Sequence, residues 1–159
     1  MKKNIKSIII LTMFLLAVFI YFKPFAGACF AQDNAAGRND GEIKHEIDIF
    51  VDKAMDKDPS TAGMVKAAEE GEKMWDAELN KYYKLLSAAI DNESKAALKK
   101  AQLAWISFRD AEFAMTGLFY SKKDGTMYRV IAACTRLEIV KKRALTLKNL
   151  YEEYCGQEN

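Results

Sequence analysis

Apolar side chains recur every three or four residues along three long stretches of the chain, and this spacing constrains the fold more than any other feature. It is the spacing of helices with one buried face, and it predicts helices over 60–90, 94–120 and 126–155. The chain has only 8 Gly and 2 Pro among 159 residues, which leaves little material for the turns of an all-β protein. The expected fold class is therefore all-α.

The stripe that each long helix is expected to bury can be read from the sequence. In the first helix it consists of Met64, Ala68, Gly71, Trp75, Leu79, Tyr82, Leu86 and Ala89. In the second helix it consists of Leu98, Ala101, Trp105, Phe108, Met115 and Phe119. In the third helix it consists of Val130, Ala133, Leu137, Val140, Ala144, Leu147, Tyr151 and Tyr154.

A shorter helix is predicted before these three, because apolar residues keep helical spacing over 43–55 and Asp58-Pro59 then disfavours further helix. The later connections are short and polar, which makes consecutive helices antiparallel neighbours. The expected architecture is a short helix followed by a three-helix antiparallel bundle, four helices in total, in one domain over 42–155. Residues suited to N-caps or to a left-handed turn stand at the junctions, namely Ser60 or Thr61, Ser94, Thr126 and Gly125.

The start of the chain has the three parts of a secretion signal. An apolar run over 8–22 precedes small residues and follows the basic residues Lys2, Lys3 and Lys6. We expect a signal peptide over 1–31, with cleavage after Ala31 favoured over a site three residues earlier, and then a flexible tether over 32–41. This predicts an exported protein, periplasmic or extracellular. Contact with a membrane is expected only through this leader, if it stays uncleaved or if Cys29 is lipidated.

The charge of the chain argues against nucleic acid as a partner. Residues 1–31 hold 4 Lys and no acid, so removing them from 24 basic and 22 acidic side chains leaves 20 and 22. Nucleic-acid binding needs a concentrated basic surface, which this balance does not indicate. Charge is nevertheless divided, with 6 basic and 13 acidic groups over 32–80 and 14 basic and 9 acidic over 81–159. Either the early and late helices attract one another, or the acidic half steers a cationic partner.

Signals of catalysis and metal binding are weak. His45 is the single histidine, has no thiol near it in the sequence, and is interpreted as an exposed spectator. Neither Cys-x-x-Cys nor His-x-x-x-His occurs. Cys134 and Cys155 lie on one predicted helix, about 30 Å apart, so no internal disulfide is expected. We predict a protein that is not an enzyme and that has no metal and no cofactor.

A polar line runs inside the apolar stripe of the helix expected over 94–120, and it consists of Gln102, Trp105, Arg109 and Glu112. The preceding helix offers a matching line of Asp76, Asn80 and Tyr83. A partly buried arginine needs acceptors, because its unpaired desolvation is costly. We expect Arg109 to pair with Asp76 or Glu112, and Gln102 and Asn80 to complete a network that fixes the register of the two helices. The alternative is that these groups line a ligand pocket.

These residues carry a resemblance to a known family. The sequence over about 45–152 resembles the LprI-like lysozyme-inhibitor domain family, through Asp76, Leu79, Asn80, Tyr83, Gln102, Trp105, Arg109, Asp110, Glu112 and Gly125. The resemblance implies a small exported helical domain that binds a lysozyme, and it implies a structural role in the bundle for these motif residues. Many members carry cysteines at the positions of Ala54, Ala67 and Phe113, so the resemblance also implies a core held here by packing alone.

Two surfaces are candidates for contact with a protein partner. One is a basic and aromatic loop that would plug the lysozyme cleft, made of Lys122, Lys123, Tyr128 and Arg129. The other is an acidic helix surface that would clamp the cationic exterior of the enzyme, made of Asp48, Asp52, Asp56, Glu69, Glu70 and Glu72. The alternative function is that of a cell-envelope adaptor, which would dock through exposed apolar residues of the last helix such as Ile131, Ile139 and Leu150.

Overall fold

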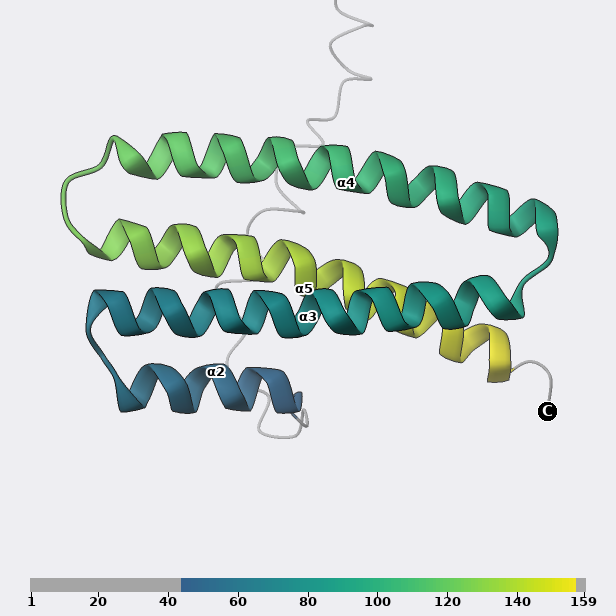
Figure 1. Ribbon diagram of the computed structural model, residues 1–159, viewed down its shortest axis with the longest axis horizontal. Helices are drawn as coiled ribbons and strands as arrows, with labels where there is room; N and C mark the ends of the chain where they lie inside the picture. The colour runs from purple at the N-terminus through teal and green to yellow at the C-terminus, as the bar shows by residue number, and fades with distance from the viewer. Residues whose placement is uncertain (1–43, 157–159) are drawn as a thin grey trace, which may run out of the picture. The chain divides into compact units, whose positions relative to one another are not determined.

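The computed structural model describes residues 44–156, which form four helices and, within that range, no strand. The helices are α2 (Glu46–Lys57), α3 (Thr61–Ala89), α4 (Asn92–Ser121) and α5 (Met127–Gly156), as Figure 1 shows. The predicted all-α fold, with a short helix before three long ones, is confirmed. The predicted signal peptide and tether lie outside the described residues.

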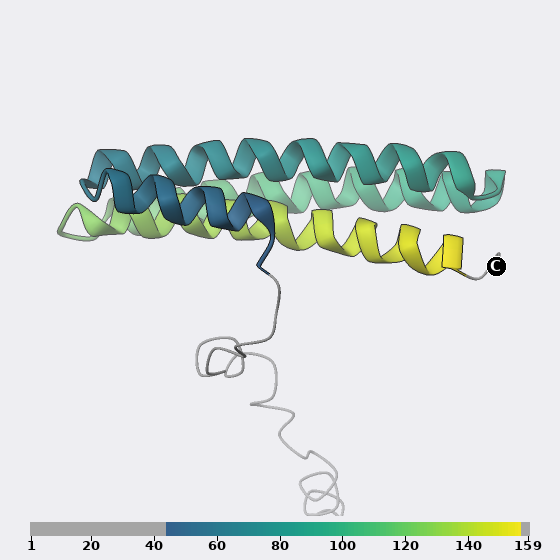
Figure 2. The same cartoon turned by 90° about the horizontal axis from the view of Figure 1, so that it is seen from below.

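Helices α3 and α5 run in the same direction, and α4 runs antiparallel to both (Figure 1). The closest helix pairings are α3 with α5, α2 with α3, and α4 with α5. Figure 2, seen from below, shows α2 in front and α4 behind, with α3 along the upper edge and α5 along the lower edge. Helix α5 therefore packs closely against both α3 and α4. Helix α4 packs mainly against α5 and not against α3, the helix that precedes it in the sequence.

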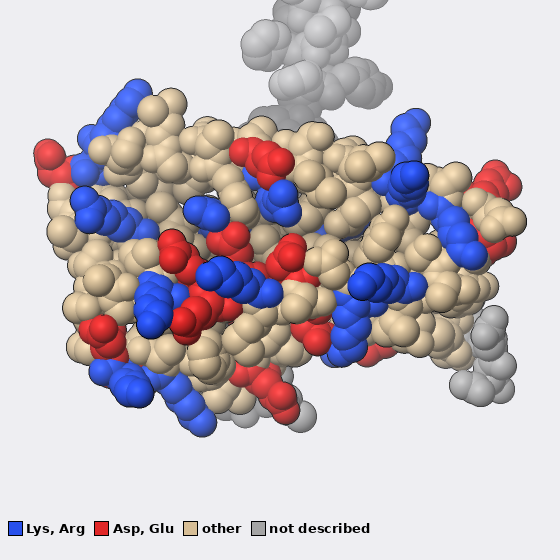
Figure 3. All heavy atoms as spheres, in the orientation of Figure 1, with Lys and Arg blue, Asp and Glu red and all other residues tan. Residues whose placement is uncertain are grey.

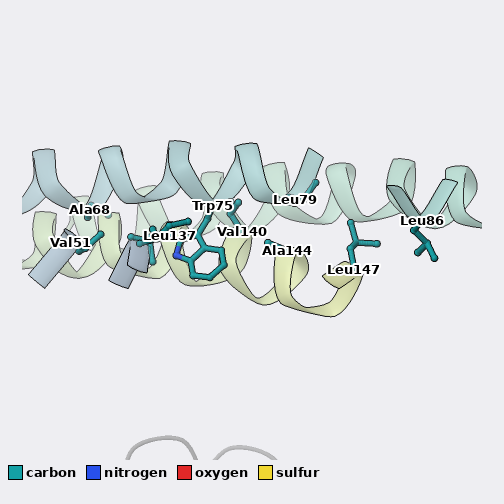
Figure 4. Packing of buried hydrophobic residues seen from close by; sticks show 11 residues of the cluster. Val51, Ala68, Trp75, Leu79, Leu86, Leu137, Val140, Ala144 and Leu147 are labelled. Atoms are coloured by element: carbon teal, nitrogen blue, oxygen red, sulfur yellow. The ribbon is translucent and has the colours of Figure 1, made fainter. Parts of the chain in front are cut away.

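The core lies mainly between α3 and α5, with two residues of α2 added to it. Figure 4 shows Trp75 and Leu79 of α3 lying against Val140 and Leu147 of α5, and all four side chains are fully buried. The predicted stripes of α3 and α5 supply these residues, and the remaining buried apolar residues of the cluster are Ile47, Val51, Ala68, Leu86, Ala133, Leu137 and Ala144. For α3 and α5, the predicted stripes are confirmed in their central residues, which are buried.

The prediction for α4 is wrong for four of the six residues of its stripe, one of which is the exposed Ala101. Thr116 is the only buried residue of this helix, and Leu98 and Trp105 are partly buried against the core. Phe108, Met115 and Phe119 were expected inside but are each more than half exposed. The reason is that α4 carries apolar residues on two faces and packs against α5 with one of them.

The helix starts match the predicted positions but not all of the predicted caps. Ser60 caps α3 by accepting a hydrogen bond from the Gly63 amide at 3.1 Å. Asp91, not Ser94, caps α4, because its carboxylate accepts from the Ser94 amide at 2.9 Å and from the Ser94 hydroxyl at 2.8 Å. These two hydrogen bonds hold the pKa of Asp91 below its usual value.

Two further residues at the helix starts have roles that the sequence did not reveal. The Thr126 hydroxyl accepts a hydrogen bond from the Thr61 hydroxyl at 3.0 Å, which ties the start of α5 to the start of α3 instead of capping α5. His45 is not an exposed spectator: its Nδ1 caps α2 by accepting from the Ile47 amide at 3.2 Å. Its ring also lies 4.4 Å from the Trp75 ring, centroid to centroid. Both residues therefore position helices.

Gly71 allows α2, α3 and α5 to approach closely at one point. A Cβ atom there would overlap the Val51 side chain and come within 2.7 Å of Leu137 Cδ1. Both neighbours are buried and belong to the core. Gly117 on α4 offers the contrast, because a Cβ atom there would meet nothing within 4 Å.

We predict that Gly71→Ala destabilises the protein by about 1–3 kcal/mol, because the added methyl group overpacks the core. Gly117→Ala should instead raise stability, by up to about 1 kcal/mol, because it relieves the entropic cost of a glycine inside a helix. Urea unfolding followed by circular dichroism measures both. Equal effects of the two variants would contradict the close approach at Gly71.

Candidate functional site

The polar line of α4 faces α5 rather than α3. Arg143 of α5 donates a hydrogen bond from Nε to Gln102 Oε1 at 3.0 Å. Its guanidinium carbon also lies 6.0 Å from the centre of the Trp105 ring. Burial lowers the pKa of Arg143 from its usual value, although the group stays a cation at any physiological pH. This contact joins the two helices.

The predicted network between α3 and α4 is wrong. Arg109 binds the carboxylate of its own neighbour Asp110, with Nη2 and Oδ1 2.7 Å apart. Asn80 turns back within α3 and donates to the Asp76 carbonyl at 2.7 Å and to its carboxylate at 2.9 Å. Glu112 has no ion pair within residues 44–156. Because α4 turns this face toward α5, local acceptors satisfy Arg109 and Asn80 separately.

Three arginines and two aromatic rings alternate along the contact of α4 with α5. Arg109 lies over the Trp105 ring at 5.4 Å and over the Phe113 ring at 5.8 Å. Arg136 of α5 also lies over the Phe113 ring, with its guanidinium carbon 4.6 Å from the ring centre. We call this set the arginine–aromatic ladder, and it consists of Arg143, Trp105, Arg109, Phe113 and Arg136.

The ladder extends to α3 through one ion pair. Arg136 Nε lies 3.3 Å from Glu72 Oε2, and the Glu72 side chain is mostly buried. Phe113 stands where the family resemblance places a cysteine in many members, and here its ring receives two guanidinium groups. The polar line predicted from the sequence included Trp105 and Arg109, but the predicted network contained neither Arg136 nor Arg143, although a separation of seven residues places both on one face of α5.

The ladder fits a structural role better than a ligand pocket. Three hollows in the described surface lie at the tip of the α4–α5 hairpin, between α2 and α3, and between α2 and α5, and the ladder lines none of these three. Arginine does not exchange protons near neutral pH, so these groups offer no acid or base. The geometry instead holds α4 against α5.

The connection of α4 to α5 forms a basic and aromatic tip. Gly125 has φ of 103°, the left-handed conformation that was predicted for it. The rings of Tyr120 and Tyr128 stack with centroids 6.0 Å apart, and Lys123 lies 5.0 Å over the Phe119 ring. A hollow of about 450 Å³ lies beside these residues.

The cations of this tip are largely free of acidic partners. Lys122 and Arg129 are exposed and have no ion pair within residues 44–156. The Thr61–Thr126 hydrogen bond fixes the tip to the start of α3. The structure thus brings together the four residues of the predicted basic and aromatic surface, Lys122, Lys123, Tyr128 and Arg129, in and just after one short loop.

The acidic candidate surface is largely paired with bases of the same chain. Asp48 accepts from Lys141 Nζ at 2.9 Å, Glu72 pairs with Arg136, and Asp52 pairs with Lys44. Glu70 lies 3.9 Å from Lys66, whereas Asp56 and Glu69 have no partner within the described range. In the face drawn in Figure 3, acidic and basic side chains alternate across the middle of the molecule. The early acids and late bases therefore attract one another, as one of the two interpretations of the sequence expected.

The described residues offer little for other chemistry. Between residues 44 and 156, no group of three or more His, Cys, Asp or Glu side chains is placed to hold a metal ion. Over the same range, no helix combines the length and apolar character needed to cross a bilayer. Cys134 and Cys155 are free thiols, and burial raises the pKa of Cys134, which disfavours its reactive thiolate.

The fold and these surfaces define an all-α helical-bundle domain in which the ladder joins α4 to α5. The model of the family described as "Lysozyme inhibitor LprI" matches residues 52–147, and the chain belongs to this family. The resemblance predicted from the motif residues is thereby confirmed.

Two proteins that are similar to this chain are both described as uncharacterized. The chain is 34% identical over 98 residues to the uncharacterized protein R02472 of Rhizobium meliloti (strain 1021), covering 54% of this chain and 69% of that protein. It is also similar to the crystal structure of an uncharacterized protein from Burkholderia thailandensis, with a TM-score of 0.67 and 25% identity. That match covers 71% of this chain and 56% of the other, so this chain spans little more than half of that protein.

We predict that Arg143 and Gln102 are energetically coupled, whereas Arg109 and Asp76 are not. A double-mutant cycle of Arg143→Ala and Gln102→Ala should give a coupling energy of about 1 kcal/mol, since it removes a hydrogen bond between two helices. The same cycle for Arg109→Ala and Asp76→Ala should give nearly zero. Urea unfolding of the single and double variants measures both cycles. A larger coupling energy for Arg109 and Asp76 than for Arg143 and Gln102 would support the network between α3 and α4 instead.

Proposed function

We propose that this chain is an exported, non-enzymatic binding domain that inhibits a lysozyme by protein–protein contact through the tip of the α4–α5 hairpin. The contact residues are Lys122, Lys123, Tyr128 and Arg129. The family description supports a lysozyme as the partner. The observation that carries the proposal is that exposed cations of this tip lack acidic partners within residues 44–156.

The chemistry of a lysozyme cleft suits such a tip. Lysozymes cleave glycan with two carboxyl groups that face each other across a cleft. Exposed Lys and Arg side chains bind carboxylates through charge-assisted hydrogen bonds, and stacked tyrosines provide a firm apolar support. The tip is narrow, because it is a loop between two helices, and the hydrogen bond between Thr61 and Thr126 limits its movement.

The acidic helix surface is a weaker candidate for the same partner. Asp48 and Glu72 are mostly buried and bind cations of α5, so their charge is already neutralised inside the chain. Binding a cationic enzyme through them would first require these ion pairs to break. The acids left without partners, Asp56 and Glu69, are too few to form an extended clamp.

Export is part of this proposal. The leader over 1–31 has the pattern of a secretion signal, and lysozymes act on cell walls outside the cytoplasm. A chain that begins at residue 32 keeps all the helices and buried core residues that the structure describes, since these lie within 44–156. This shorter chain is therefore the form to test.

We predict that the chain from residue 32 onward slows the loss of turbidity when a lysozyme digests a peptidoglycan suspension. The triple variant Lys122→Ala, Lys123→Ala, Arg129→Ala should need at least about tenfold more protein for the same inhibition, because several charge-assisted hydrogen bonds are lost. Inhibition by the unchanged chain should also weaken as salt is raised, because exposed charges are screened.

A triple variant with the same loss of charge provides the control. Lys73, Lys84 and Lys99 are exposed, lie on α3 and α4 away from the tip, and can be replaced by Ala together. This control should inhibit as well as the unchanged chain. Full lysis at micromolar excess of the unchanged chain would reject inhibition and favour the adaptor alternative, while equal loss in both variants would reject the tip as the contact surface.

A further inference from the structure

Helix α4 exposes a continuous apolar line on the side turned away from α5. Seven residues at successive steps of four and three are all apolar and all exposed, namely Ala97, Ala101, Ala104, Phe108, Ala111, Met115 and Leu118. We call this line the outer seam of α4. Its large side chains are well exposed to solvent: Phe108 is 54% and Leu118 is 60% exposed. The adjoining Phe119 is also more than half exposed.

The outer seam is separate from the line that binds α5. Residues advance by about 100° around a helix, which places the seam roughly 120° from the line of Gln102, Arg109 and Thr116. No helix within residues 44–156 covers it, because α4 pairs closely only with α5. Figure 3 shows the region of α4, along the upper edge, mostly in the colour of uncharged residues.

The spacing of the seam is that of a coiled coil. Alternating steps of four and three average 3.5 residues, the repeat by which two helices pack along their whole length. This pattern extends over 22 residues, from Ala97 to Leu118. Coiled-coil packing needs a second helix of matching length and spacing, which limits the kinds of partner that fit.

The arrangement of small and large residues points to a second copy of this chain. We propose that two chains associate through their outer seams, with the two α4 helices antiparallel around a two-fold axis near residue 106. In this register Ala104 meets Phe108 of the second copy, Ala97 meets Met115, and Ala101 meets Ala111. Each large side chain beside the axis then lies against a small one, as close packing requires. A parallel pair would instead set Phe108 against Phe108 and Ala101 against Ala101.

Charge favours the same orientation. The first half of α4 carries Lys95, Lys99 and Lys100 against Glu93, whereas its second half carries Asp110 and Glu112 against Arg109. An antiparallel pair sets the basic half of one helix beside the acidic half of the other. A parallel pair would set the lysines beside one another, which disfavours that arrangement.

The area of the seam is sufficient for a specific pair. Four large side chains that are each about half exposed, with the alanines between them, offer on the order of 600 Å² per chain. A pair would bury about 1,200 Å² in total, which is near the lower end for stable specific interfaces. The association also leaves the hairpin tips free, because each lies about 24 Å from the axis along the helix. It therefore does not depend on the proposed inhibition.

Sedimentation equilibrium of the chain from residue 32 onward, at about 10–200 μM, tests the association. We expect a reversible dimer. The variant Phe108→Lys with Met115→Lys should weaken the dimer at least about 100-fold, because two charges would enter an apolar interface. Leu103→Lys is the matched control: Leu103 is 57% exposed on the same helix but lies off the seam. It should change the dissociation constant by less than about threefold.

Cross-linking tests the orientation. Ser107 is exposed beside the seam and lies one residue from the axis, so it would come close to Ser107 of the second copy along the same flank of the antiparallel pair. Ser107→Cys should form a disulfide-linked dimer on mild oxidation, whereas Leu103→Cys and the unchanged chain, with Cys134 and Cys155, should not.

Three results would overturn the proposal, and none of them bears on lysozyme inhibition. The first is a monomer over the whole concentration range, which would assign the seam to another occupant such as the leader or a foreign helix. The second is a dimer that Phe108→Lys with Met115→Lys leaves intact. The third is a dimer that Ser107→Cys fails to link. Because the readouts are mass and cross-linking, a chain that dimerises without inhibiting a lysozyme would still support this inference.

Discussion

The close approach of three helices at Gly71 is the constraint on which the rest of the structure depends. Val51 of α2 and Leu137 of α5 occupy the space that any larger side chain on α3 would need. This brings α3 and α5 near enough for Trp75, Leu79, Val140 and Leu147 to be fully buried. The stability of the bundle thus rests on a contact between helices that are parallel and distant in sequence.

Helix α5 holds α3 and α4 by different kinds of interaction. Toward α3 it presents an apolar stripe, whereas toward α4 it presents Arg136 and Arg143. Guanidinium groups packed on aromatic rings can stabilise a contact that water still reaches, because the ring faces attract the cation without complete desolvation. Helix α4 is consequently attached with only Thr116 buried, and its second apolar face has no neighbour in the described part of the chain.

The sequence predicted the helices and the α3–α5 core because both follow from a local period of 3.6 residues. It did not predict the burial of α4, since this helix has apolar residues on two faces and periodicity cannot say which face meets a neighbour. Phe108 and Met115 were therefore placed inside. The expected partner of Arg109 was wrong for a related reason: consecutive helices were assumed to pack together, whereas α4 pairs with α5 and Asp110 lies nearer. The binding roles of the tip and of the acidic helices remain predictions.

Among the described residues, the charged side chains that form ion pairs gather near α2 and α3, whereas unpaired cations and exposed apolar side chains gather on α4 and at its end. On the side of α2 and α3, ion pairs such as Asp48–Lys141 and Glu72–Arg136 neutralise part of the excess acid of the first half of the sequence and the excess base of the second half. On the side of α4, the tip has cations with no acidic partner in the described part of the chain, and the outer seam exposes large apolar side chains to water. Exposed apolar lines of this length favour aggregation, so a helix with no partner would be expected to carry polar residues there. The composition of α4 is therefore better explained by contacts made outside the chain than by the fold alone.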